Sequence, residues 1–176
     1  ATFQKDGNLE GVKSIDEDGI INTSQNEGSV CFDKRFKTMY FTRCENKEEK
    51  MLGCDIWRVD IVEGEFKNPQ KMNLKKSEDI SVGHPCLTED GKKLIFASDM
   101  RENTRGEKSF GGRDLWYITY NKKSKKWDSI PTNMGPEINT FGNELFPSIP
   151  LKGLNKGKLF FASDGHKGIG GLDIFY

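Results

Sequence analysis

The sequence has no long apolar run and no excess of either charge. Its longest apolar segments are as short as Leu94 to Ala97 and Leu159 to Ala162. Because roughly 20 apolar residues are needed to span a bilayer, we expect no transmembrane segment. The 27 Lys and Arg residues balance the 27 Asp and Glu residues, unlike the basic surface of a nucleic-acid-binding protein. The stretch Ala1 to Lys5 is neither basic nor followed by an apolar core, so we expect no signal peptide there.

Histidine is scarce, and the short motifs of common enzyme classes are missing. The only histidines are His84 and His166, and no Cys-x-x-Cys pair is present, so we expect no zinc site. Gly-x-Ser-x-Gly, His-Glu-x-x-His and phosphate-loop motifs do not occur. Thr88 to Gly91 differs from the Asp box of sialidases because Gly follows Asp directly. We therefore expect a chain that is not an enzyme and that holds no metal or cofactor.

The sequence does contain an internal repeat, which is the feature to seek first. Val30 to Thr42 aligns without a gap on Pro85 to Ala97, and Pro147 to Ser163 follows the same pattern with a three-residue insertion. The segment Ile21 to Thr23 recurs as Ile138 to Thr140. Another element places an Asp every 59 residues, each followed two residues later by an aromatic side chain: Asp55 with Trp57, Asp114 with Trp116, and Asp173 with Phe175.

Each repeat is expected to fold as four strands. Pro85 to Thr88, Lys93 to Ser98 and Asp114 to Tyr120 are predicted strands, and a fourth lies near Trp127. Asp90-Gly91 is a strong signal for a tight turn. Because such a unit cannot cover both of its faces alone, copies stack radially as the blades of a propeller. We therefore predict an all-β chain, specifically a β-propeller with about three four-stranded blades.

The phase of the repeat leads us to expect a partial propeller. Ala1 to Ile15 aligns with Trp116 to Ile130, at an offset of 115 residues. On this alignment the chain begins and ends in a third strand, cut mid-blade at both ends, as part of a longer protein. The repeats then cover approximately residues 1–27, 28–82, 83–142 and 143–176 of a single domain. A small open array of sheets is the alternative.

Two segments carry a resemblance to a known family. His84 to Asp99, together with Gly111 to Trp116, resembles the repeat core of TolB-like, WD40-like propellers. Residues 162–165 and 170–175 repeat the match, whereas the first unit departs from it at Asp33 to Phe36 and at Arg43-Cys44. The resemblance covers essentially the whole chain.

Asn133 to Thr140 and the closing Gly171 to Tyr176 narrow the resemblance. They are similar to the propellers of Bacteroidota outer-membrane proteins with an OmpA-like peptidoglycan-binding domain, including a type IX secretion system component. This implies a periplasmic location at the outer membrane and a non-catalytic scaffold that binds protein partners in an envelope or secretion complex. Peptidoglycan would be bound by a domain outside this chain. Two rival functions stay open: the propeller domain of a larger peptidase or other enzyme, and a glycan- or peptidoglycan-binding module.

The repeated Asp and aromatic positions are expected to be structural. One carboxylate per blade cannot form the six-oxygen cage of calcium, so we expect Asp55, Asp114 and Asp173 to accept backbone N–H groups in loops. We expect the same turn-forming role for Asp99 and Asp164. The other recurring position holds side chains that we expect to pack between blades rather than to stack on sugars, namely Trp57, Trp116 and Phe175.

The cysteines and the long connections complete the expectations. Cys44 and Cys54 flank the connection between two neighbouring strands, and we expect them to form a disulfide, as the periplasm permits. Cys31 and Cys86 occupy equivalent inner-strand positions and are expected to be free and buried. His84, at the start of an inner strand, is assigned to packing rather than to a ligand. The charged loops Glu45 to Leu52 and Met100 to Gly111 are the expected partner-contact surface.

Overall fold

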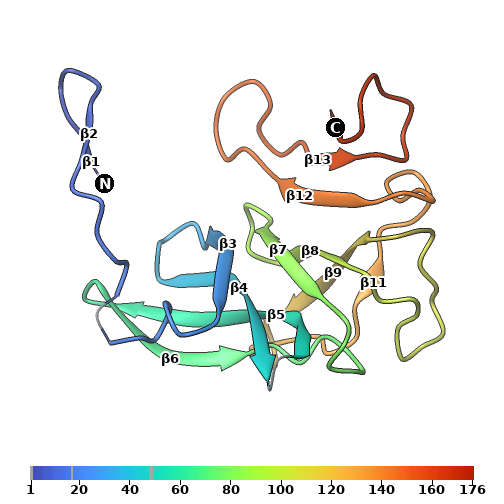
Figure 1. The fold of residues 1–176 in the computed structure, drawn as a ribbon, viewed down its shortest axis with the longest axis horizontal. Helices are drawn as coiled ribbons and strands as arrows, with labels where there is room; N and C mark the ends of the chain where they lie inside the picture. The colour runs from blue at the N-terminus through green and yellow to red at the C-terminus, as the bar shows by residue number, and fades with distance from the viewer. Residues whose placement is uncertain (1, 17, 48–49) are drawn as a thin grey trace.

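The chain is entirely β in the residues that its computed structural model describes, which are 2–16, 18–47 and 50–176. This confirms the all-β prediction. No helix occurs among the described residues, so none is available to cross a membrane. A small N-terminal hairpin stands apart from three larger antiparallel sheets (Figure 1).

The hairpin consists of β1 (Thr2–Phe3) and β2 (Leu9–Glu10). The first sheet has the order β3-β4-β5-β6, the second β10-β9-β8-β7 with β11 also paired to β9, and the third β12-β13-β14. Their strands are β3 (Asn26–Phe32), β4 (Thr38–Lys47), β5 (Lys50–Val62), β6 (Glu65–Lys71), β7 (Val82–Leu87), β8 (Lys93–Ser98), β9 (Asp114–Asn121), β10 (Lys126–Trp127), β11 (Thr132–Asn133), β12 (Glu144–Ser148), β13 (Phe160–Ser163) and β14 (Asp173–Phe175).

The first connections of the first and second sheets show how the sequence sets the turn. Between β7 and β8, Asp90-Gly91 turns the chain with Gly91 at φ +67°, where glycine meets no steric penalty. Phe36, 55 residues earlier, takes the same left-handed conformation at φ +53°. The carboxylate of Asp33 holds this strained turn by accepting the backbone N–H groups of Lys37 and Thr38 at 2.6 and 2.7 Å. The first repeat therefore keeps the turn although it lacks the glycine.

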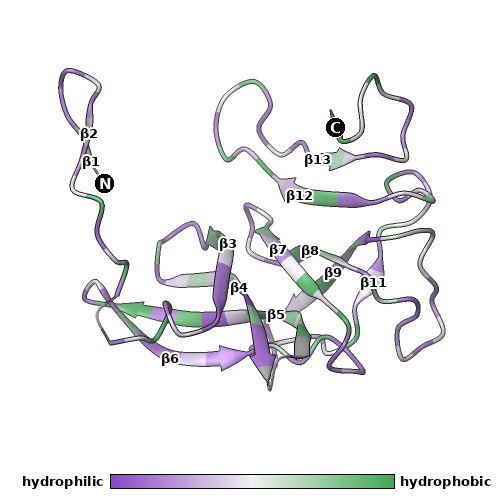
Figure 2. Cartoon of the chain, viewed as in Figure 1, coloured by the Kyte–Doolittle hydropathy of each residue, from purple (hydrophilic) through white to green (hydrophobic). Residues whose placement is uncertain are grey.

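The three larger sheets pack face to face, and the second and third each lay their first strand on the sheet before them. Strand β7 packs against β3, β4 and β5, and β12 packs against β7, β8 and β9. Apolar residues are frequent in strands such as β5, whereas β6 and most of the connections are mainly hydrophilic (Figure 2). No sheet closes on itself among the described residues.

Strict alternation along the strands fills the space between the sheets. In β8, Leu94 and Phe96 face the first sheet and join the core that contains Tyr40 and Ile56, whereas Ala97 points the other way toward Phe161 of the third sheet. A separate core covers the outer face of the first sheet, where Met39, Phe41 and Val59 pack with Ile21 from the preceding connection. Full burial of each such large side chain contributes about 1.5–3 kcal/mol.

The prediction that Glu45 to Leu52 forms a loop is wrong. Strand β4 continues to Lys47 and β5 begins at Lys50, so the two form a long hairpin. Residues 48 and 49 lie outside the described residues. The pairing continues because Cys44 and Cys54 are directly opposite one another and an irregularity after Cys44 brings Asn46 opposite Met51. The sequence did not indicate this extension, because its residues are mainly charged and polar strand ends have a composition similar to that of loops.

Candidate functional site

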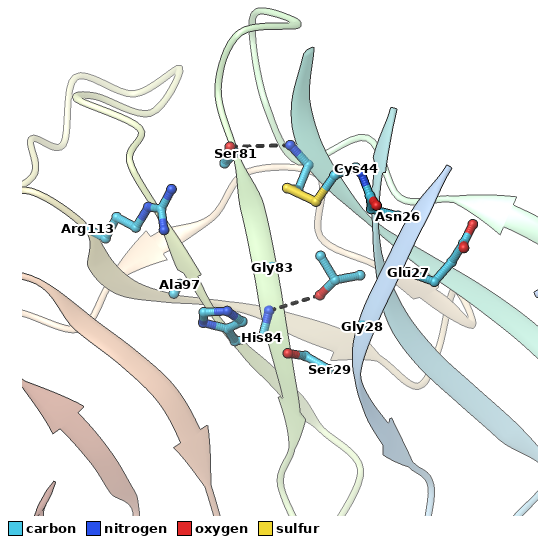
Figure 3. A pocket seen from close by; sticks show the side chains of 12 residues that line it. Asn26, Glu27, Gly28, Ser29, Cys44, Ser81, Gly83, His84, Ala97 and Arg113 are labelled. Carbon is cyan, nitrogen blue, oxygen red and sulfur yellow. Dashed lines mark hydrogen bonds between the residues drawn. A yellow bond between two sulfur atoms is a disulfide. The ribbon is translucent and has the colours of Figure 1, made fainter. Parts of the chain in front are cut away.

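A pocket of about 230 Å³ lies between the first strands of the first and second sheets (Figure 3). Ser29 and the Cys44–Cys54 disulfide line it from the first sheet, and His84 and Ala97 line it from the second. Arg113, the residue before β9, reaches toward it from the side. All these residues lie toward the edge at which β3, β7 and β9 begin, because neighbouring strands are antiparallel.

Small residues create this space where β7 crosses the first sheet. A Cβ atom on Gly83 would lie 3.0 Å from the methyl carbon of Thr42, so glycine permits the close approach of the two elements. The crossing is held by the backbone N–H of His84, which donates to the Thr42 hydroxyl at 3.1 Å. Nearby, the backbone N–H of Cys54 donates to the Ser81 hydroxyl at 3.3 Å. The pocket therefore has a rigid frame.

A bulge with one left-handed residue recurs in the first strand of every sheet. Ser29, His84 and Phe146 occupy corresponding positions, have φ values of +42°, +54° and +53°, and coincide with the register shifts of β3, β7 and β12. L-residues rarely adopt this conformation, which costs about 1–2 kcal/mol each. Its repetition in three sheets shows that the packing of the sheets selects it.

The bulges also bring two rings together. His84 stacks on Phe146 with ring centroids 4.2 Å apart, and the backbone N–H of Phe146 donates to Nδ1 of His84 at 3.4 Å. An imidazole that accepts at Nδ1 carries its proton on Nε2. Partial burial, with Arg113 nearby, lowers the pKa of His84 below its ordinary value. The ring is therefore kept neutral, with one N–H still able to donate.

The charges at the pocket are not balanced. Glu27 is committed elsewhere, because its Oε1 accepts from Arg43 Nε at 2.9 Å and from the Thr23 hydroxyl at 2.6 Å. Arg113 is exposed, and its guanidinium forms no ion pair with any described residue. The arrangement can attract an anion, since a cation and neutral donors surround a mainly apolar space.

Comparison with known proteins gives no independent information about this pocket. No family model matches the chain, and no curated protein matches it. The assignment of the pocket therefore depends on the residues that line it.

The three repeated aspartates do not share one role. Asp114 accepts the backbone N–H groups of Phe110 and Gly111 at 2.8 and 3.2 Å, and Asp173 accepts those of Ile169 and Gly170 at 2.7 and 2.9 Å. These two carboxylates hold loops as expected. Asp55 differs from the expectation, because its carboxylate is paired with the ammonium groups of Lys71 and Lys75. Among the residues with described positions, no group of three His, Cys, Asp or Glu side chains could hold a metal ion.

The aromatic side chains that follow these aspartates all face an apolar cluster. Trp116 is fully buried between the first and second sheets, and Phe175 packs between the second and third. Trp57 lies on the outer face of the first sheet, beneath the guanidinium of Arg43 at 4.6 Å from the ring centroid. The ring nitrogens of Trp57 and Trp116 are buried without a hydrogen-bond partner. These positions serve packing rather than the pocket.

The cysteines fall into two pairs. Cys44 and Cys54 form a disulfide between directly opposed residues of β4 and β5. Cys31 and Cys86 are free. Burial raises the pKa of the Cys31 thiol to about 12, with the neighbouring Cys86 adding to the effect, and burial raises that of Cys86 to about 11. Both free thiols are therefore held in the unreactive protonated form.

Sequence reasoning missed Arg113 and two glutamates, Glu27 and Glu144, that accept hydrogen bonds from threonine hydroxyls. Arg113 breaks the repeat, since Cys54 and Leu172 occupy its corresponding positions, and that departure was the available signal. Glu144 is fully buried and accepts hydrogen bonds from the hydroxyls of Thr140 and Ser163 at 2.6 and 2.7 Å. The shared spacing of Thr23 with Glu27 and of Thr140 with Glu144 could have indicated these hydrogen bonds.

Proposed function

We propose that the chain is a non-catalytic protein-interaction module in which the three sheets are consecutive blades of a TolB-like β-propeller. The face-to-face packing supports this proposal, because the second and third sheets each lay their first strand on the preceding sheet and share an apolar core with it. The β1–β2 hairpin would supply the third and fourth strands of a preceding blade.

The observation that carries the binding function is a rim of loops at one edge of the second and third sheets. A Cβ on Gly111 would come within 2.3 Å of the Phe141 carbonyl carbon, and a Cβ on Gly142 would come within 2.7 Å of the Gly165 backbone nitrogen. Backbone thus packs on backbone from one sheet to the next. Such a supported rim offers a preorganised surface.

Large apolar side chains project from this rim into solvent. Phe141 is 81% exposed and Phe110 is 47% exposed. Exposed aromatic groups on rigidly held loops are typical of surfaces that bind proteins. The rim includes one end of the Met100 to Gly111 connection, which the sequence predicted as a contact surface.

We place this module in the periplasm, in an outer-membrane-associated protein of the OmpA family that belongs to an envelope or secretion assembly, such as type IX secretion. The Cys44–Cys54 disulfide supports an oxidising compartment. The family resemblance of the repeats supports the remainder. In this proposal a separate domain binds peptidoglycan.

Site-specific photo-crosslinking tests the proposed function. A photoreactive residue replaces Phe141 in the full-length protein in its native envelope, and the control replaces Val62, which is 44% exposed at the opposite edge of the first sheet. We expect a discrete crosslinked protein from position 141 and none from position 62. Equal crosslinking at both positions, or cleavage of peptide or glycan bonds by the purified protein, would contradict the proposal.

A further inference from the structure

We propose that the pocket between β3 and β7 binds a carboxylate group carried on a short aliphatic chain, with Arg113 as its anchor. The pocket lies toward the same edge of the sheets as the proposed partner-binding rim. The inference therefore deepens the proposed function and rests on it for the biological source of the carboxylate.

The first argument is the free guanidinium of Arg113. The backbone around it is fixed, because its carbonyl accepts the backbone N–H of Glu144 at 2.6 Å. The one acidic side chain that lines the pocket, Glu27, is already bound by Arg43 and Thr23. Arg113 therefore offers a planar set of donors with no carboxylate to receive them, the geometry that a bidentate carboxylate matches.

The second argument is the character of the other polar groups. His84 has its Nδ1 occupied by the Phe146 N–H, which leaves the Nε2 proton to donate. Ser29 is exposed on the opposite wall and contributes a hydroxyl. A cation and two neutral donors thus line the space. An anion satisfies such a set better than a cation or a neutral apolar molecule.

The third argument is the size and lining of the space, which restrict the kind of anion. The walls include the Ala97 methyl group and the Cys44–Cys54 disulfide. The volume of about 230 Å³ is smaller than that of typical drug-sized pockets. Among the described residues that line the pocket, Arg113 offers one guanidinium without an ion pair, whereas a phosphate group favours several cations or backbone N–H groups. A small aliphatic carboxylate fits both the charge and the apolar lining.

Two sources carry this chemistry: a free aliphatic acid and the C-terminus of a peptide chain. Isothermal titration of the full-length protein distinguishes them with isobutyrate, N-acetyl-alanine and N-acetyl-alaninamide. Binding of both acids shows that a carboxylate with an aliphatic group suffices, and binding of N-acetyl-alanine alone assigns a peptide C-terminus. The uncharged amide is expected not to bind in either case.

Two matched variants locate the binding. Arg113→Gln is expected to weaken binding of the acid by about tenfold or more, since a charge-assisted bidentate contact is lost. Arg105→Gln removes the same charge from an exposed position in the neighbouring loop and should leave affinity unchanged. Circular dichroism and thermal unfolding of Arg113→Gln verify that the fold is intact.

The inference is overturned if neither acid binds at millimolar concentration, if Arg113→Gln binds as well as the parent, or if inorganic phosphate binds more tightly than both acids. Its failure is separable from that of the proposed function. If the parent protein binds neither acid but still crosslinks at position 141, this inference alone is overturned. Carboxylate binding without crosslinking at that position overturns the protein-docking function and retains the pocket.

Discussion

The ammonium group of Lys75 lies 3.0 Å from Oδ2 of Asp55, and both side chains are more than 90% buried. The same ammonium also lies 2.9–3.3 Å from the backbone carbonyl oxygens of Gly53, Cys54, Glu78 and Ile80, among which its three N–H groups are shared. Lys75 therefore connects the start of β5 to the segment that leads into β7. One side chain joins the first sheet to the second.

Removing Lys75 is expected to destabilise the fold strongly. Lys75→Met keeps an unbranched side chain of similar length but leaves the Asp55 carboxylate with Lys71 alone, at 2.6 Å. Breaking a buried ion pair in this way costs about 3–5 kcal/mol. Urea denaturation measures the change in the free energy of unfolding. Lys76→Met is the control, because Lys76 and its partner Glu102 are both substantially exposed, and it should change stability by less than about 0.5 kcal/mol.

The free thiols are expected to resist alkylation in the folded protein. With pKa values near 12 and 11, Cys31 and Cys86 have thiolate fractions at pH 8 on the order of one in ten thousand and one in a thousand, whereas an ordinary cysteine has about a quarter. Mass spectrometry after iodoacetamide treatment should show no label on the native protein. Two labels should appear after unfolding without reductant. Rapid labelling of the native protein would show that these thiols are accessible.

The stability contribution of His84 should decline with acidification. Its pKa is lowered in the folded protein, so the unfolded chain, with an ordinary pKa near 6.5, binds the proton first as the pH falls. The contribution is therefore complete above about pH 6.5 and is lost as the pH falls from there toward the folded-state pKa. Urea denaturation of the parent and His84→Gln at about pH 7.5 and about pH 5 checks this. The stability difference between parent and variant should shift in the variant's favour at the lower pH; an unchanged difference would show that His84 has no lowered pKa.

Position 29 in β3, where the backbone is left-handed, should favour glycine over serine. Ser29 has φ +42° and an exposed side chain, so Ser29→Gly relieves backbone strain with few lost contacts and should raise the free energy of unfolding by about 0.5 kcal/mol. Ser29→Val should lower it by about 1 kcal/mol or more, because branching at Cβ worsens the clash. Ser124→Gly, at an exposed position without positive φ, should be destabilising. A loss of stability in Ser29→Gly would contradict the strain argument.

The sequence was sufficient to locate most strands because the repeat aligns independent copies of one pattern. The predicted strand Lys93 to Ser98 coincides with β8, and Asp114 to Tyr120 differs from β9 by one residue. Local rules were enough here, since alternation and the Asp-Gly turn act within a few residues. The extension of β4 and β5 escaped prediction because cross-strand pairing can continue through charged residues.

The pocket could not be predicted because it forms between repeats rather than within one. Ser29 and His84 come from different sheets, and Arg113 enters from the start of a third strand. Their approach depends on how β7 crosses the first sheet, which periodicity along one strand does not specify. The role of Asp55 could not be predicted for a similar reason. It shares its repeat position with Asp114, which accepts a hydrogen bond from Asn133. The partners of Asp55 are instead Lys71 and Lys75, from a part of the chain that differs between the repeats.

The side chain of Asn139 acts as a substitute peptide group. Its Oδ1 accepts the Leu115 N–H at 2.8 Å, and its Nδ2 donates to the Leu115 carbonyl at 2.9 Å. Both outward-facing backbone groups are thus satisfied just beyond the short β9–β11 pairing. Unpaired backbone groups at a strand edge are templates on which other chains can add strands. One buried amide therefore closes the stretch of β9 next to β11 and leaves neither backbone group of Leu115 for another chain.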